Sequence, residues 1–212
     1  LGAAGAVYGA LLAWAQRDLK KLVAYSSISH LGLVAMGIFA REPSAVCGAV
    51  LQMVNHGIST GALFLLVGVL YDRTHRRGLE DFGGAARPMP LFALLLGVTA
   101  FASIGLPGLN GFVGEFLILS GTFTTAPVYA AVGASAVVLS AVYLLGAVRA
   151  VLFGPTPDSV AGLPDCTKRE AATLLPLAGL MVLLGVFPGP LLDRVRPSVE
   201  RIVARTRSVA QV

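Results

Sequence analysis

The stretch GLPGLNGFVGE (residues 105–115) decides how this chain has to fold. Within seven positions it carries four residues that interrupt a regular helix, namely Gly105, Pro107, Gly108 and Gly111. Proline lacks a backbone N–H donor and glycine permits unusual dihedrals, so backbone groups freed here can bind water. A proline kink alone is the plainer alternative, but a kink does not need four such residues. We therefore predict a helix that breaks here and then continues.

An acidic residue closes this stretch. Glu115 is the only charged residue between Pro88 and Val148, and the segment around it is long and apolar. A carboxylate in hydrocarbon is costly, so an acid at that depth is usually functional. A broken helix with an acid beside the break is typical of transport proteins and not of soluble enzymes.

The composition places the chain in a membrane. Of its 212 residues, 56% are hydrophobic and 13% are charged, whereas a soluble domain carries about 25% charged residues. A membrane span needs about 20 apolar residues, so at most six or seven spans fit. The net charge of +5 does not indicate a nucleic-acid partner, because the basic residues lie between apolar segments and not along one face.

Six apolar segments can be recognised, and all of them should be helices because lipid offers no hydrogen-bond partners to the backbone. They run roughly over residues 1–16, 19–40, 44–71, 88–123, 127–153 and 171–192. The fourth is the discontinuous one, with its break at 105–111. The chain opens with Leu1 inside an apolar stretch, so the first segment looks like a truncated helix. We expect an all-α membrane protein that is the C-terminal piece of something longer.

The loops between these segments predict the orientation. Ten Lys and Arg residues lie in one set of loops, at 17–21, 72–87 and 149–169. The alternating loops, 41–44 and 123–127, carry only Arg41. The positive-inside rule places the first set in the cytoplasm. Six spans then put the C-terminal tail outside, which conflicts with its arginines; we keep the assignment because short loops usually dominate.

We expect residues 1–192 to form a partial transmembrane domain and residues 193–212 to form a basic tail. Three apolar residues give this tail a thin apolar face, namely Val199, Ile202 and Val203. From Pro197 onward the tail is therefore either an amphipathic helix on the membrane surface or a solvated segment.

Polar residues gather at the middle of the second and third segments. His30 lies in the second segment, and Ser26 precedes it by one helical turn. In the third segment a polar stripe forms at positions i, i+3, i+4 and i+7, made of Gln52, Asn55, His56 and Ser59. Such a stripe should face protein or water and not lipid. Together with Glu115, three successive spans place an ionisable group near the bilayer centre.

These residue types suit proton transfer. Histidine has an unperturbed pKa near 6.5 and exchanges protons at neutral pH, and a carboxyl group removed from water can hold a proton there too. The alternatives are plainer. Each histidine can be a satisfied hydrogen-bonding residue, and Gln52 and Asn55 can hold helices together. Agreement in depth across three spans favours a proton relay.

Other chemistry is not indicated. Cys47 and Cys166 form no CxxC or His–Cys pattern, so we expect neither a disulfide nor a metal site. The sequence carries no Walker loop, dinucleotide fingerprint, haem motif or cluster motif. We expect no cofactor and no redox catalysis in this chain.

Three stretches carry a resemblance to a known family: DLKKLVAYSSISHLGLV (18–34), QMVNHGISTGALFLLVGVLYDRTHRR (52–77) and GLPGLNGFVGEFLIL (105–119). They resemble the antiporter-like membrane subunits of respiratory complex I, the NADH-quinone oxidoreductase. The resemblance runs from the start to about Pro155, and beyond it matches in helix placement only. It implies a fourteen-helix fold with two inverted five-helix repeats, each with a broken helix. The first segment would be the ninth helix and the broken one the twelfth.

The resemblance also implies roles. Glu115 is similar to the terminal acidic residue of the second half-channel, and His30 and His56 to the histidines that connect it to the central axis. Sister subunits usually carry lysine at the Glu115 position, so glutamate favours one subunit type. Asn55 stands where many relatives have a small residue. The ionisable residues of the first half-channel would lie upstream of Leu1.

The implied function is proton translocation by a membrane subunit of NADH-quinone oxidoreductase, a translocase of the bacterial plasma membrane. The redox reaction would occur elsewhere in the complex, and the partners would be the neighbouring membrane subunits and the lipid bilayer. One alternative is a subunit of a multisubunit Na+/H+ antiporter or of a membrane-bound hydrogenase. Another is a structural scaffold without its own proton path.

Overall fold

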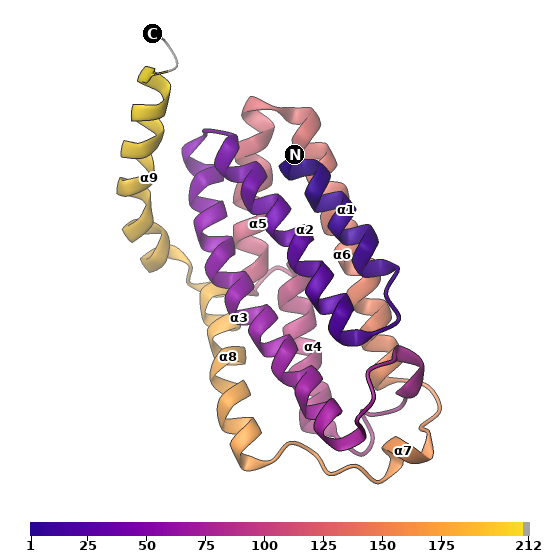
Figure 1. Cartoon of the computed structure of the whole chain (residues 1–212). Helices are drawn as coiled ribbons and strands as arrows, with labels where there is room; N and C mark the ends of the chain where they lie inside the picture. Colours follow the sequence, from indigo (N-terminus) through magenta and orange to yellow (C-terminus); the bar gives the residue numbers. More distant parts are fainter. Residues whose placement is uncertain (210–212) are drawn as a thin grey trace.

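The computed structural model describes residues 1–209, and within them it contains helices and no strand (Figure 1). The helices of the bundle are α1 (Gly2–Trp14), α2 (Leu19–Phe39), α3 (Pro43–Thr74), α4 (Pro90–Ile104), α5 (Asn110–Thr125), α6 (Pro127–Leu152) and α8 (Lys168–Val186). Two short helices lie in loops, η1 (Leu79–Asp81) and α7 (Asp158–Ala161), and α9 (Gly189–Val209) follows the bundle. The predicted all-α membrane fold is confirmed.

Four of these helices, α2, α3, α6 and α8, are long and apolar enough to cross a membrane. Helix α1 is apolar but has only 13 residues. Helices α4 and α5 have 15 and 16 residues, and each is shorter than the roughly 20 residues that a crossing needs. Together they replace one span, as predicted for the discontinuous fourth segment.

The break between α4 and α5 is built from glycines in the left-handed region. Gly105 ends α4 with φ +80°, and Gly108 follows with φ +91°. These dihedrals are easy for glycine and strained for other residues. Gly111 lies in the first turn of α5 and not in the break itself. It allows close approach, because a Cβ there would lie 2.1 Å from the Ala102 carbonyl oxygen of α4.

Small residues bring α1 and α2 into contact. A Cβ on Gly32 would lie 2.3 Å from the Ala6 nitrogen, and a Cβ on Gly9 would lie 2.5 Å from the Ser29 nitrogen. Helices in lipid commonly associate through such small residues, because van der Waals packing must replace the hydrophobic effect. The contact between α1 and α2 therefore helps to hold α2, and with it His30, in place.

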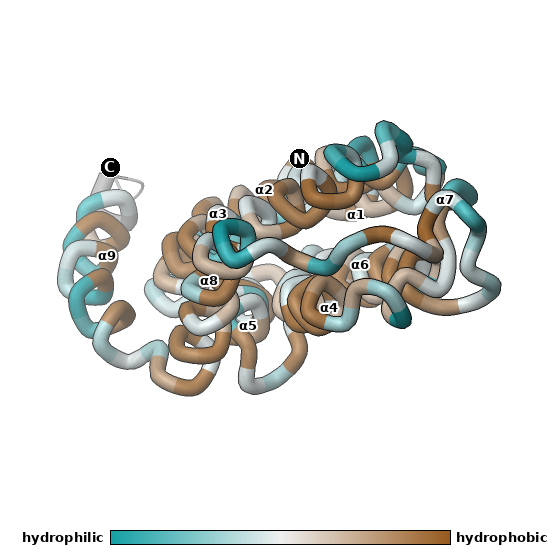
Figure 2. The backbone as a smooth tube through the Cα atoms, turned by 90° about the horizontal axis from the view of Figure 1, so that it is seen from below, coloured by the Kyte–Doolittle hydropathy of each residue, from teal (hydrophilic) through white to brown (hydrophobic). Residues whose placement is uncertain are grey.

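The basic loops meet at one end of the bundle. The Leu19 N–H donates to the Arg77 carbonyl at 2.9 Å, and the Ala85 N–H donates to the Val151 carbonyl at 3.2 Å. Figure 2 shows this end, where hydrophilic segments gather around the largely hydrophobic helices. The sharing of one end by these loops is what the predicted topology requires.

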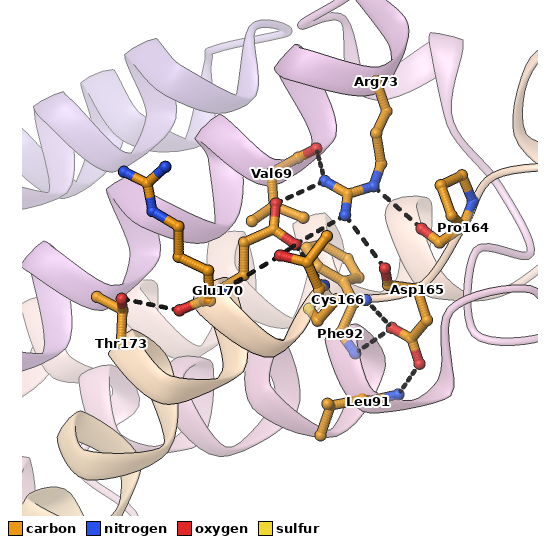
Figure 3. Close-up of polar contacts among 11 residues, drawn as sticks. Val69, Arg73, Leu91, Phe92, Pro164, Asp165, Cys166, Glu170 and Thr173 are labelled. Atoms are coloured by element: carbon orange, nitrogen blue, oxygen red, sulfur yellow. Dashed lines mark hydrogen bonds and ion pairs between the residues drawn. The ribbon is translucent and has the colours of Figure 1, made fainter.

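An ion pair at this end joins α3 to α8 (Figure 3). Arg73 donates to both carboxylate oxygens of Glu170, at 2.9 and 2.8 Å. It also donates to the carbonyls of Pro164 and Asp165, at 3.0 and 3.2 Å. The bidentate geometry makes this a stronger and more directional contact than a simple surface pair.

The Asp165 carboxylate ties the same loop to the start of α4. It accepts hydrogen bonds from the Leu91 and Phe92 N–H groups at 2.8 and 3.0 Å. Burial by itself would raise the pKa of Asp165. Its backbone donors and the charge of Arg73 outweigh burial, and the pKa lies below its ordinary value. This contact therefore fixes the first half of the broken helix.

The last predicted segment, 171–192, was too long. Helix α8 ends at Val186, because Pro188 disfavours a helical conformation in the residue before it. Leu191 and Leu192 belong to α9.

The tail is helical through Val209 and rests on protein. Val199 and Val203 are buried against Cys47 of α3, whereas Ile202 is 58% exposed. The predicted apolar face is therefore divided between a protein contact and an exposed side. Residues 210–212 of the predicted tail lie outside the described residues.

Candidate functional site

The site is centred on Glu115, which lies one turn into α5 and is 4% exposed. Its Oε1 atom lies 3.3 Å from Nδ1 of His30 on α2. The same oxygen accepts a hydrogen bond from Nε2 of Gln52 on α3 at 3.2 Å. Three helices that are separate in the sequence therefore bring an acid, an imidazole and an amide together inside the protein.

Glycines on α3 and α5 make this meeting possible. A Cβ on Gly48 would lie 2.6 Å from the Leu117 Cβ, so α3 and α5 approach almost backbone to backbone. A Cβ on Gly114 would lie 2.4 Å from Oε1 of Gln52. The absence of both side chains lets Gln52 lie against α5 and reach the carboxylate of the next residue, Glu115.

The break contributes a glycine directly beside the acid. A Cβ on Gly105 would lie 2.5 Å from Oε2 of Glu115. The left-handed turn at Gly105 therefore has two effects: it ends α4 and it leaves space for the carboxylate. This is the direct structural link between the predicted break and the predicted acid.

The two predicted histidines lie side by side. The ring centroids of His30 and His56 are 5.3 Å apart, with the planes tilted by 42°. His30 is 3% exposed, whereas His56 is partly exposed and its Nδ1 atom lies 3.0 Å from the Thr60 hydroxyl. The residues His56, His30 and Glu115 therefore form a continuous row of titratable groups across α3, α2 and α5.

The four predicted supporting residues divide into two pairs. Gln52 and Asn55 bridge helices: Asn55 Nδ2 donates to the Asn110 carbonyl at 2.6 Å, and Asn110 Nδ2 donates back to the Asn55 carbonyl at 3.3 Å. Ser26 and Ser59 instead donate to carbonyls of their own helices, at 2.7 and 3.0 Å. Only the first pair joins separate elements of the site.

Two buried polar residues near the site were not predicted. Asn110 is fully buried and connects the start of α5 to α3. Its place as a polar residue inside the stretch of helix breakers was the available signal. Tyr143 of α6 is 2% exposed. Its position in the apolar span 127–153, away from the expected interface, could have drawn attention to it.

Several polar atoms around the site are buried without a hydrogen-bond partner among the described residues. They include the amide oxygens of Gln52, Asn55 and Asn110 and the Tyr143 hydroxyl. Buried polar atoms are normally satisfied by protein or by water, and a water needs two to four such partners. The row of titratable groups therefore lies beside buried polar atoms that could bind water. Among residues 1–209, no group of three or more His, Cys, Asp or Glu side chains is arranged to hold a metal ion.

The sequence matches a protein family over most of its length. Residues 1–142 match the family described as NADH:quinone oxidoreductase/Mrp antiporter, transmembrane. NADH-quinone oxidoreductase subunit M of Rhodobacter capsulatus is 47% identical over 204 residues, which cover 96% of this chain and 40% of that protein. Subunit M of Pseudomonas aeruginosa is 46% identical, with 91% of this chain and 38% of that protein covered. Subunit M is the subunit type that glutamate at position 115 favoured. The chain thus spans about two fifths of these relatives.

Solved structures give the same result. Respiratory complex I from Thermus thermophilus contains a similar chain with a TM-score of 0.92 and 36% identity, which covers 96% of this chain and 43% of that one. A chain of the Mrp complex from Dietzia has a TM-score of 0.88 at 19% identity, covers 99% and 47%, and shows the shared fold alone. The predicted resemblance is confirmed, and this chain belongs to the transmembrane NADH:quinone oxidoreductase/Mrp antiporter family.

Proposed function

We propose that this chain is part of a proton-translocating membrane subunit of an NADH-quinone oxidoreductase in a bacterial plasma membrane. Electron transfer from NADH to quinone takes place in other subunits, and neighbouring membrane subunits are its partners. The observation that carries the proposal is the buried contact between Nδ1 of His30 and Oε1 of Glu115 at 3.3 Å. Ionisable side chains in a membrane interior are costly, and where they occur they usually mark a path for protons or ions.

The proposed transfer runs along the row of three residues. A proton that reaches the partly exposed His56 passes to His30, directly or through a water between the rings. The His30 imidazolium then gives its Nδ1 proton to the Glu115 carboxylate. This leaves a neutral ring with its proton on Nε2 and a neutral carboxyl group, so charge and protons balance.

Gln52 and the break have supporting roles in this step. The Gln52 amide donates to Oε1 of Glu115 and so stabilises the ionised carboxylate before transfer. Gly105 leaves room for Oε2 of Glu115, and water bound to the backbone groups freed at the break can take the proton onward. Moving a proton against 100 mV requires about 2.3 kcal/mol, which the redox reaction must supply.

The alternatives are of two kinds, a subunit of another respiratory or antiporter membrane complex and a structural scaffold. The fold of the Mrp complex chain from Dietzia supports an antiporter role only at the level of the fold, whereas the relatives with higher identity are NADH-quinone oxidoreductase subunits. A membrane-bound sulfane sulfur reductase chain, at 29% identity and a TM-score of 0.84, represents a further kind of respiratory membrane complex. A scaffold role would give Glu115 a structural contact with no effect on transport.

The test is Glu115→Gln in the full-length subunit, within the assembled complex in proteoliposomes. We expect assembly and uncoupled electron transfer to persist and proton pumping driven by NADH to be lost. The matched control is Glu80→Gln, the same change at an exposed residue of η1, which should pump normally. Full pumping by Glu115→Gln would overturn the proposal.

A second variant separates the relay from the scaffold. His56→Ala removes a ring that is only partly buried, so the fold should tolerate it. The relay predicts an assembled complex that pumps poorly. A scaffold predicts lost assembly with no separate pumping defect. Replacing sodium by potassium during the assay distinguishes proton from sodium transport.

A further inference from the structure

Tyr143 presents a polar group that the proposed relay leaves unused. It lies on α6, is 2% exposed, and is among the largest fully buried side chains. Its hydroxyl makes no hydrogen bond within residues 1–209. A buried hydroxyl without a partner is unfavourable, because it loses water and gains nothing in return. Phenylalanine would fill the same space without this loss, so the hydroxyl needs another explanation.

The hydroxyl points toward the site. It approaches the Ser26 side chain of α2 without closing a hydrogen bond, and it lies within electrostatic range of Glu115. The Ser26 hydroxyl donates to the Val23 carbonyl at 2.7 Å, which leaves its oxygen lone pairs free to accept. Ser26 also precedes His30 by one helical turn, so both side chains lie on the same face of α2.

On the side toward the basic loops, the surroundings of Tyr143 become apolar. A small cavity of about 20 Å³ lies there, and its lining consists of apolar residues of α2, α3, α4 and α6, among them Leu22, Val23, Leu144 and Val151. The Tyr143–Ser26 pair therefore stands between the titratable row and an apolar layer.

We propose that Tyr143 is a further proton-relay residue of this subunit, and this inference rests on the proton-translocating function proposed above. A phenol can accept a hydrogen bond on its oxygen and donate its own proton at the same time. A bound water that carries an excess proton beside Ser26 gives it to the Tyr143 oxygen, while the phenol proton passes through a second bound water to the Glu115 carboxylate. Water and phenol are restored, and one proton has moved.

The test is Tyr143→Phe in the full-length subunit of the assembled complex in proteoliposomes. The ring is kept, so assembly and uncoupled electron transfer should be unchanged. We expect the rate of proton uptake linked to NADH oxidation to fall about a hundredfold, the lower end of the scale on which a positioned proton-transfer group acts. Incorporation of 3-fluorotyrosine at position 143 keeps a hydroxyl and should restore uptake.

The matched control is Tyr129→Phe on the same helix, where the side chain is 61% exposed and the change should have no effect. A pure packing role for Tyr143 predicts normal pumping and equal or greater thermal stability in Tyr143→Phe, and that result would overturn the inference. Glu115→Gln, measured in parallel, separates the two proposals. If Glu115→Gln stops pumping while Tyr143→Phe pumps normally, only the role of Tyr143 fails; if both pump normally, the proposed function fails as well.

Discussion

Gly114 and Gln52 occupy adjoining space so closely that a Cβ on Gly114 would lie 2.4 Å from the Gln52 amide oxygen. The packing of α5 on α3 thus determines where the amide that donates to Glu115 lies. The close approach of the two helix backbones and the hydrogen bond to Glu115 therefore depend on each other. A substitution that disturbs one should disturb the other.

We expect Gly114→Ala to push Gln52 away from Glu115. Overpacking a close helix contact costs about 1–3 kcal/mol, and the loss of the Gln52 donor should reduce proton pumping even where the complex assembles. Thermal unfolding and pumping in proteoliposomes measure the two effects. Gly61→Ala is the control, because no described atom lies within 4 Å of a Cβ at that position of α3. Unchanged pumping in Gly114→Ala would show that the Gln52 contact is dispensable.

The reciprocal bonds between Asn55 and Asn110 should hold the start of α5 in place. Asn55→Ala removes the 2.6 Å bond to the Asn110 carbonyl, at a cost of about 1–3 kcal/mol for a buried acceptor left without a partner. Hydrogen exchange in residues 105–112 should then become faster. Ser59→Ala, which removes a hydroxyl bonded within its own helix, should leave exchange in this segment unchanged. Equal exchange in both variants would show that the Asn55–Asn110 hydrogen bonds do not hold the start of α5 in place.

The Arg73–Glu170 pair should contribute measurably to stability. The side chains are 10% and 24% exposed and the contact is bidentate, so we expect a coupling of about 1–3 kcal/mol in a double-mutant cycle with Arg73→Met and Glu170→Gln. The comparison is the Arg76–Asp81 pair, at 3.4 Å with exposures of 55% and 31%. Such an exposed pair should give about 0.5 kcal/mol or less. Equal coupling in the two cycles would show that bidentate geometry adds nothing here.

Asp165 gives a pH-dependent prediction. Its pKa is lower in the folded protein than in the unfolded chain. The stabilisation is therefore fully present above the unfolded pKa of about 3.9 and is lost as the pH falls through the folded pKa. Hydrogen-exchange protection of the Leu91 and Phe92 amides, corrected for intrinsic rates, should be constant above about pH 4 and fall below it.

The control for this prediction is Asp165→Asn, which lacks the titration. Its protection at the start of α4 should be lower at neutral pH and should not show the same fall in acid. A fall of equal size in both proteins would assign the effect to other carboxylates.

The sequence allowed prediction of the broken helix and its acid because both are local. Glycine dihedrals and the missing N–H of proline act on their own backbone, and Glu115 stands out in an apolar segment. His30 and His56 were found for the same reason. The limits were also physical. Helix periodicity shows which residues share a face but not which faces meet, so the Gln52–Glu115 hydrogen bond could not be foreseen.

Tyr143 and Asp165 illustrate what sequence reasoning missed. A tyrosine in an apolar span is usually an interface residue or part of the core, and only the packing of α6 against α2 brings its hydroxyl toward Ser26. Asp165 looks like an ordinary loop charge in the sequence. Its partners, Leu91 and Phe92, lie more than 70 positions away. The residue roles inferred from the family resemblance stay predictions until the variants are measured.

The glycine at position 105 also limits how this protein can change over time. Its left-handed φ disfavours every residue that has a side chain, and a Cβ there would meet the Glu115 carboxylate. Any single substitution at this codon therefore disturbs the backbone and the acid together. A replacement of Gly105 would therefore require a change at Glu115 as well. We expect substitutions at these two positions to occur together.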